Sequence, residues 1–250
     1  MKPHFNLNRY VIAGILILLC SNAVAKDCVV LLHGLVRSAS AMDKLAKRFL
    51  KEGYIVSNIN YPSRKYSIEK LAELAIGESI QQCKKKSASS RDEIKASKIN
   101  FVTHSLGDIL VRVYLKKHRI DNINRVVMLG PPNQGSEVVD TLKDLPGFEL
   151  LNGPAGMQLG TKDTDIPRSL GPVNFEVGVI AGTQSMNLIL SLFLPGKDDG
   201  KVTVEAAKVK GMKNFVTLPT MHPFMMKSNR VIEQAVYFIK YGKFFIAEKL

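Results

Sequence analysis

Short apolar runs alternate with amphipathic stretches along most of the chain. Six runs have the length and composition of buried strands: Cys28 to Leu32, Tyr54 to Ile59, Ile99 to Thr103, Arg125 to Leu129, Phe175 to Ala181 and Asn214 to Leu218. Apolar residues recur at helical spacing between several of these runs. Because parallel strands joined by crossover helices give this alternation, the pattern predicts an α/β fold with about six mostly parallel strands flanked by helices.

Helical spacing marks four segments. They are residues 42–50, a stretch capped by Ser67 and reaching Ile80, residues 106–119 and residues 229–241. Two other stretches interrupt the rhythm. Lys84 to Lys98 is polar and basic, as expected of a solvated connection. Residues 140–174 are rich in Gly and Pro, and a loop of that length is usually functional, so we expect a cap over a site.

The first 25 residues have the features of a secretory signal peptide. Lys2 and Arg9 precede an apolar run from Val11 to Cys20, and Ala23-Val24-Ala25 resembles a cleavage site. We therefore expect residues 1–25 to be removed on export and residues 26–250 to form one domain in the periplasm or outside the cell. The alternative is an uncleaved segment that anchors the chain to the membrane.

Export changes the interpretation of the cysteines. Cys28 and Cys83 are the two that remain once the signal peptide is removed, and an oxidising compartment allows them to form a disulfide. Two buried free thiols are the alternative.

Composition and charge narrow the class of protein. With 250 residues, 46% hydrophobic and 23% charged, the chain has the composition of an ordinary globular protein. Its net charge of +13 favours anionic partners. Nucleic acid is a poor candidate, because the basic residues are scattered, Trp is absent and no binding motif occurs.

A serine stands where the third predicted strand turns into a helix, in Thr103-His104-Ser105-Leu106-Gly107. This is the setting of a nucleophile elbow, which exposes the serine hydroxyl beside the free amides of a helix start. Thr103 occupies a position that is commonly Gly. A plain strand-to-helix junction with a capping serine is the alternative interpretation.

A second feature follows the first strand. His33-Gly34-Leu35 stands where hydrolases with a nucleophile elbow place the loop that supplies a second oxyanion donor. The backbone amides of Leu35 and Leu106 are therefore expected to converge on one substrate oxygen. We interpret His33 itself as structural.

The base and the acid follow from chain order. In a hydrolase ordered Ser, acid, His, the histidine lies beyond the later strands, and His222 alone meets this condition. His104 is expected to point away from the nucleophile. The acid is expected after the fifth strand, where Asp199, next to Gly200, is our choice and Asp198 is the alternative.

Together these segments, with Gly130-Pro131-Pro132-Asn133-Gln134-Gly135-Ser136, resemble exported bacterial esterases and lipases of the α/β-hydrolase superfamily. The resemblance implies an acyl-serine mechanism with Ser105, Asp199 and His222 as triad, Leu35 and Leu106 as oxyanion donors, and neither cofactor nor metal. Two residues depart from the common sequence around the nucleophile: Thr103, and Asp108 at a position that is commonly small. Arg112, four residues after Asp108, is expected to form an ion pair with it.

The substrate class and partners stay open. An ester or lipid substrate is expected, while amidases, acyltransferases and non-catalytic proteins that bind lipid or a partner share the fold. The apolar stretch within residues 183–197 is expected to be either a core helix or a wall that receives an acyl chain. Lys197 and Lys201 beside it could favour peripheral contact with an anionic membrane surface. The sequence does not predict an oligomeric state.

Overall fold

The computed structural model describes residues 26–88, 98–185, 194 and 196–245. Six parallel strands form one sheet in the order β2-β1-β3-β4-β5-β6. The strands are β1 (Cys28–Leu32), β2 (Ile55–Asn58), β3 (Ile99–His104), β4 (Ile123–Leu129), β5 (Val177–Gly182) and β6 (Asn214–Leu218). The predicted fold class is confirmed, and the predicted strands agree with these bounds to within two residues.

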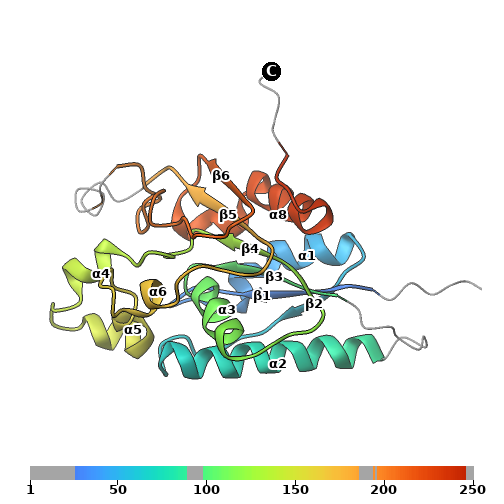
Figure 1. Ribbon diagram of the computed structural model, residues 1–250, viewed down its shortest axis with the longest axis horizontal. Coiled ribbons are helices and arrows are strands. Elements are labelled where there is room, and N and C mark those ends of the chain that lie inside the picture. The colour runs from blue at the N-terminus through green and yellow to red at the C-terminus, as the bar shows by residue number, and fades with distance from the viewer. Residues whose placement is uncertain (1–25, 89–97, 186–193, 195, 246–250) are drawn as a thin grey trace, which may run out of the picture.

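Helices cover both faces of the sheet. On one face lie α2 (Ile68–Ala88) and α3 (Leu106–Lys117), and on the other lie α1 (Asp43–Lys51) and α8 (Asn229–Tyr241) (Figure 1). The short helices α4 (Glu137–Leu142), α5 (Phe148–Met157) and α6 (Ile166–Ser169) gather at one end of the sheet, and the 3₁₀ helices are η1 (Ala39–Met42) and η2 (His222–Lys227).

The strands are apolar because the sheet is buried on both faces. Along β1, Val30 and Leu32 pack with α2 and α3, whereas Val29 and Leu31 pack with α1 and α8. Successive side chains of a strand point to opposite faces, so a strand covered on both sides needs an unbroken apolar run. This requirement explains why strand positions could be predicted from sequence.

The strand order positions the functional site. From β1 the chain proceeds to β2 on one side and then returns to β3 on the other side of β1. The loops that follow β1 and β3 therefore diverge at the carboxyl edge of the sheet, and such a switch point is where open α/β sheets bind ligands. Both segments singled out by sequence, His33-Gly34-Leu35 and the turn at Ser105, lie at this point.

Three details of the sequence prediction were wrong. The stretch 140–174 is not one long loop, since α5 and α6 form within it. The helix α5 begins directly after Gly147, which has φ +87°, and α6 begins at Ile166-Pro167. The helix α2 continues to Ala88, into the stretch interpreted as a surface connection. Leu50, the last apolar residue of the segment 42–50 that helical spacing marks, is 58% exposed instead of buried.

The predicted disulfide is confirmed. Cys28 in β1 and Cys83 in α2 are bonded, with their Cα atoms 5.9 Å apart, and both residues are buried in the core. The bond links the long helix α2 to the first strand across a separation of 55 residues, and a loop of that length corresponds to roughly 4 kcal/mol of stabilisation in the chain-entropy model.

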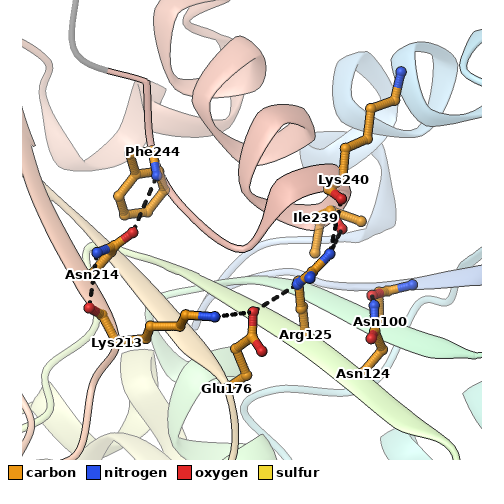
Figure 2. A network of polar contacts seen from close by, with 9 residues as sticks. All are labelled: Asn100, Asn124, Arg125, Glu176, Lys213, Asn214, Ile239, Lys240 and Phe244. Atoms are coloured by element: carbon orange, nitrogen blue, oxygen red, sulfur yellow. Dashed lines mark hydrogen bonds and ion pairs between the residues drawn. The ribbon is translucent and has the colours of Figure 1, made fainter.

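A polar network at the amino ends of β4, β5 and β6, with Arg125 of β4 at its centre, holds the end of α8 against the sheet (Figure 2). Arg125 Nε donates to Glu176 Oε1 at 2.7 Å, and its terminal nitrogen donates to the carbonyls of Ile239 and Lys240 at 2.8 and 3.0 Å. The last carbonyls of a helix have no partner within the helix, and they carry its negative dipole end. Arg125 therefore donates to carbonyls of α8 that lack a partner within the helix, and its positive charge stabilises the negative end of the helix dipole.

We expect Arg125→Ala to destabilise the fold by about 1.5 to 3 kcal/mol, because it removes charge-assisted hydrogen bonds from partly buried acceptors. Arg119→Ala is the matched control, since Arg119 pairs with Asp121 in a contact whose side chains are 90% and 87% exposed. Chemical denaturation of the two variants measures the difference. Equal midpoints for Arg125→Ala and the wild-type protein would contradict the role of the network.

Candidate active site

Ser105 occupies a sharp turn between β3 and α3. Its backbone has φ 56° and ψ −115°, a conformation that L-residues rarely adopt and that the surrounding packing must maintain. Gly107 allows the turn to form, since a Cβ atom at this position would lie 2.8 Å from the Leu32 carbonyl oxygen. The turn thus brings the start of α3 against the end of β1 and presents the serine at the carboxyl edge of the sheet.

His222 lies between Ser105 and Asp199. Its Nε2 is 3.0 Å from Ser105 Oγ, and its Nδ1 is 2.8 Å from Asp199 Oδ2. Asp199 is 1% exposed and His222 is 4% exposed, so their pairing is shielded from water. The three residues selected from sequence are therefore brought together in the order that nucleophilic catalysis requires.

Backbone amides orient the carboxylate of Asp199. Its Oδ1 accepts hydrogen bonds from the amides of Lys201 and Val202 at 3.0 and 2.9 Å, which leaves Oδ2 facing the imidazole. The neighbouring Asp198 uses its Oδ1 to accept a hydrogen bond from the Gly200 amide at 2.7 Å. Of the two aspartates that the sequence left open, Asp199 is the partner of His222.

The segment after β1 approaches the serine closely. A Cβ atom on Gly34 would lie 2.8 Å from His104 Nδ1 and 3.1 Å from Ser105 Cβ, so this position accepts only glycine without displacement. The buried ring of His33 stacks on Tyr61 at 4.0 Å, and the Tyr61 hydroxyl donates to the His33 carbonyl. These contacts agree with a structural role for His33 and fix the path of the backbone into Leu35.

The two amides predicted to bind an oxyanion lie on either side of this approach. Leu106 is the first residue of α3, and the backbone amides in the first turn of a helix have no acceptor within the helix. Leu35 lies in the turn after β1 and lines the same pocket as Ser105. Beside them, Val36 has φ 57°, an uncommon conformation for a β-branched residue, and its amide donates to Ser63 Oγ at 3.2 Å.

His104 is a site residue that sequence reasoning missed. Its ring does not point away from the site, because Nε2 lies 3.0 Å from the carbonyl oxygen of His222 and the two rings are 4.8 Å apart. Burial, followed by the charge of His222, lowers the pKa of His104 well below its usual range. A neutral His104 can donate from Nε2 to that carbonyl and hold the loop that carries His222.

The two departures from the common elbow sequence are partners. The Thr103 hydroxyl donates to Asp108 Oδ1, and both residues are fully buried. The expected ion pair between Asp108 and Arg112 was wrong, since the guanidinium donates to the backbone and side-chain oxygens of Asn133 and to the Gly171 carbonyl. Thr103 and Asp108 therefore replace two small residues with one hydrogen-bonded pair beneath the nucleophile.

Asp108 provides a prediction about pH. Burial raises the pKa of this carboxyl well above its usual range, against the opposing effects of the Thr103 hydroxyl and the Arg112 charge. A group with a raised folded-state pKa stabilises the fold fully below its unfolded pKa of about 3.9, and this contribution is lost as pH rises through the folded pKa. We expect wild-type stability to fall relative to Asp108→Asn above about pH 4, with a slope approaching 1.4 kcal/mol per pH unit.

Thermal or chemical denaturation of both proteins across pH measures this difference. Parallel stability curves would contradict the raised pKa of Asp108.

A pocket of about 90 Å³ opens beside the serine. One wall is apolar and consists largely of side chains from α4, α5 and the turn after Asp199, namely Leu35, Pro132, Val138, Val139, Phe148, Leu159 and Val202. Arg37 and Lys201 also line it. The stretch from Met186 to Pro195, proposed from sequence as an apolar wall, lies outside the described residues except for Leu194, which is buried.

Among residues 26–88, 98–185, 194 and 196–245, His, Cys, Asp and Glu side chains form no group of three or more that could hold a metal ion. In the same part of the chain, none of the helices has the length and apolar character needed to cross a membrane.

The arrangement of sheet and helices recurs in solved lipases and esterases. Bacillus licheniformis lipase BlEst2 in its mature form superposes with a TM-score of 0.66 and 21% identity, over 86% of this chain and 91% of that one. Aspergillus fumigatus lipase B gives 0.63 and 16%, over 86% and 53% of the two chains. The metagenomic carboxyl esterase MGS0156 gives 0.59 and 18%, over 79% and 65%. The protein therefore shares the fold of these lipases and esterases.

The sequence itself narrows the class. It matches the palmitoyl protein thioesterase family over residues 28–164, more than half of the chain, and the chain belongs to that family. This range includes the Leu35 turn and Ser105 but ends before Asp199 and His222. A search of curated protein sequences gave no match.

Proposed function

We propose that the protein is a serine hydrolase that cleaves carboxylic esters of lipid or acyl substrates through an acyl-serine intermediate. The observation that carries this proposal is the continuous hydrogen-bonded line from Ser105 Oγ through the His222 ring to Asp199, with distances of 3.0 and 2.8 Å. A capping serine at a plain strand-to-helix junction has no reason to meet a buried His–Asp pair. The strained backbone of Ser105 supports the same assignment.

In the proposed reaction, Ser105 Oγ attacks the ester carbonyl while His222 Nε2 takes the hydroxyl proton. Asp199 Oδ2 accepts the hydrogen bond from Nδ1–H and stabilises the imidazolium. The carbonyl oxygen becomes an oxyanion, and the amides of Leu35 and Leu106 are the proposed donors to it. His222 then protonates the leaving alcohol, and water, activated by the same imidazole, hydrolyses the acyl-serine.

The apolar wall of the pocket is the proposed acyl site. Val138, Val139 and Leu159 are almost fully buried around it, and burial of acyl methylenes against such a surface contributes roughly 0.8 kcal/mol each. In this arrangement α4 and α5 cover the acyl group, and α5 belongs to the segment 140–174 that was expected to be a cap. A volume of about 90 Å³ favours short acyl chains unless these helices move apart.

The family match makes the thioester bond a second candidate for the bond that the protein cleaves. An acyl-serine mechanism treats both bonds alike, since the acyl half and the oxyanion are the same and only the leaving group differs. The alternatives of amide hydrolysis, acyl transfer and non-catalytic lipid binding use the same pocket and are separated by assay.

An assay on matched substrates tests the proposal. We expect the purified protein to hydrolyse p-nitrophenyl esters from acetate to decanoate and the corresponding S-acyl thioesters, with a maximum at one chain length. The ratio of the two series at that length assigns the bond. A folded protein that binds these substrates but hydrolyses neither series would contradict the proposed enzyme and favour a lipid-binding protein.

We also propose that residues 1–25 direct export to the periplasm or the medium. The buried disulfide supports this location, because structural disulfides persist in oxidising compartments. Amino-terminal sequencing of protein from cell fractions tests it, with Lys26 as the expected first residue. Peripheral contact with an anionic membrane, proposed from the positive charge, predicts co-sedimentation with phosphatidylglycerol vesicles that salt reverses.

A further inference from the structure

A second hollow lies next to the catalytic pocket. It is an open groove of about 1080 Å³, and Arg37 lines both the groove and the pocket that contains Ser105. Arg37 follows Leu35 by two residues, and Lys227, which also lines the groove, ends the 3₁₀ helix η2 that begins at His222. The groove is therefore formed in part by the two segments that carry a proposed oxyanion donor and the proposed base.

The lining of the groove is positively charged. Arg37, Arg64, Lys65 and Lys227 contribute to it, whereas neither Asp nor Glu does. None of the four side chains forms an ion pair with an acid in the described part of the chain. Elsewhere in the described residues, Arg48, Arg119, Arg125 and Arg168 form such ion pairs, whereas Arg112 and Arg230 do not.

The positive charge extends into the catalytic pocket. Lys201 lines that pocket together with Arg37, and burial followed by the charge of Arg37 lowers the pKa of Lys201. Asp199 opposes this effect, but its carboxylate is already engaged by His222 and by two backbone amides. An anionic group that lies between the pocket and the groove would relieve the repulsion between these two cations.

Apolar side chains flank the same groove. Leu150 and Leu151 of α5 are 84% and 63% exposed, and Val36 is 50% exposed. Arg64 donates to the Leu151 carbonyl at 3.5 Å, so the cationic loop and the exposed turn of α5 are in contact. A lining of cations beside exposed leucines is complementary to an amphiphile that carries an anionic head and an apolar body.

We propose that the groove binds the phosphate of an anionic glycerophospholipid, whose acyl ester is cleaved at Ser105. This inference rests on the proposed function and names its substrate class. The acyl group occupies the pocket beside Val138 and Val139, and the glycerol phosphate passes Arg37 into the groove. Arg64 and Lys65 then contact the phosphate, as guanidinium and ammonium groups commonly do.

Two soluble substrates that differ only by a phosphate test this inference. They are 1-hexanoylglycerol and 1-hexanoylglycerol 3-phosphate. We expect kcat/KM to be at least tenfold higher for the phosphate ester at low salt, and this preference to decrease as ionic strength rises. Arg64→Gln combined with Lys65→Gln should reduce the preference by about tenfold, because two cations are lost from the groove. Arg119→Gln, which alters an exposed ion pair elsewhere, should preserve it.

The same ligands separate binding from catalysis. In the Ser105→Ala variant, calorimetry should detect binding of 1-hexanoylglycerol 3-phosphate at least tenfold tighter than that of 1-hexanoylglycerol. Binding without hydrolysis by the wild-type protein would support the groove and overturn the proposed enzyme. Equal rates and equal affinities for the two esters would overturn the groove and leave the enzyme intact.

Two further outcomes would also overturn the inference. One is a phosphate preference that the Arg64→Gln and Lys65→Gln substitutions leave unchanged. The other is the loss of vesicle binding in that double variant when the wild-type protein does not distinguish the two soluble esters. That result would make the groove a contact for the charged membrane surface instead of a site for one phosphate.

Discussion

Ser105→Ala and His222→Ala are each expected to reduce ester hydrolysis by roughly 10⁴- to 10⁶-fold while the protein remains folded. The loss is large because nucleophile and base act as a unit, so removing either one removes the acyl-serine route. Ser105→Ala removes a single oxygen, and in His222→Ala the amides of Lys201 and Val202 still donate to the Asp199 carboxylate. Steady-state kinetics on a chromogenic ester, with circular dichroism to verify folding, measure the effect.

The two variants also control for each other. If each loss arose from general disruption, combining the substitutions would multiply their effects, whereas members of one catalytic unit give a double variant no slower than the slower single variant. Hydrolysis within tenfold of the wild-type rate in either folded variant would contradict the assignment.

Asp199→Asn is expected to reduce kcat by about 10⁴-fold, and Asp198→Asn is expected to have a small effect. An amide at position 199 can donate to Nδ1 and thereby favour the wrong tautomer of His222, while the size of the side chain is preserved. The matched substitution at Asp198 leaves in place the hydrogen bond that His222 Nδ1–H donates to Asp199. Kinetics of the two variants on one ester give the ranking.

The reverse ranking would assign the acid to Asp198 and contradict the geometry around His222. Equal and small effects would instead mean that His222 needs no carboxylate.

Much of the fold was predictable because the sheet is buried on both faces. A strand such as β1 must then be continuously apolar, and that pattern is readable without knowing the neighbours. The helices α5 and α6 were not predictable from the same rule. Gly and Pro normally indicate loops, but here Gly147 precedes a helix, Gly153 kinks it at φ 68°, and Pro167 lies in the first turn of another.

The site was predictable where chain order and uniqueness sufficed. His222 was identified because no other histidine follows the later strands, and Asp199 was one of two adjacent candidates. The choice between them depends on which carboxylate the amides of Lys201 and Val202 orient, and periodicity does not specify this contact.

His104, which was expected to point away from the nucleophile, is the last residue of β3. At the next position the chain turns sharply with φ 56°, and the ring contacts the loop that carries His222. The Thr103–Asp108 pair joins a strand to a helix across that same turn, so no helical or strand spacing rule describes it.

Covalent labelling by a fluorophosphonate tests the central claim most directly, because this reagent requires a serine that is activated by a neighbouring base. The account predicts that the folded wild-type protein gains one adduct, that peptide mass spectrometry locates it on Ser105, and that Ser105→Ala gains none. An absence of labelling in the folded protein, or an adduct on a different residue, would contradict it.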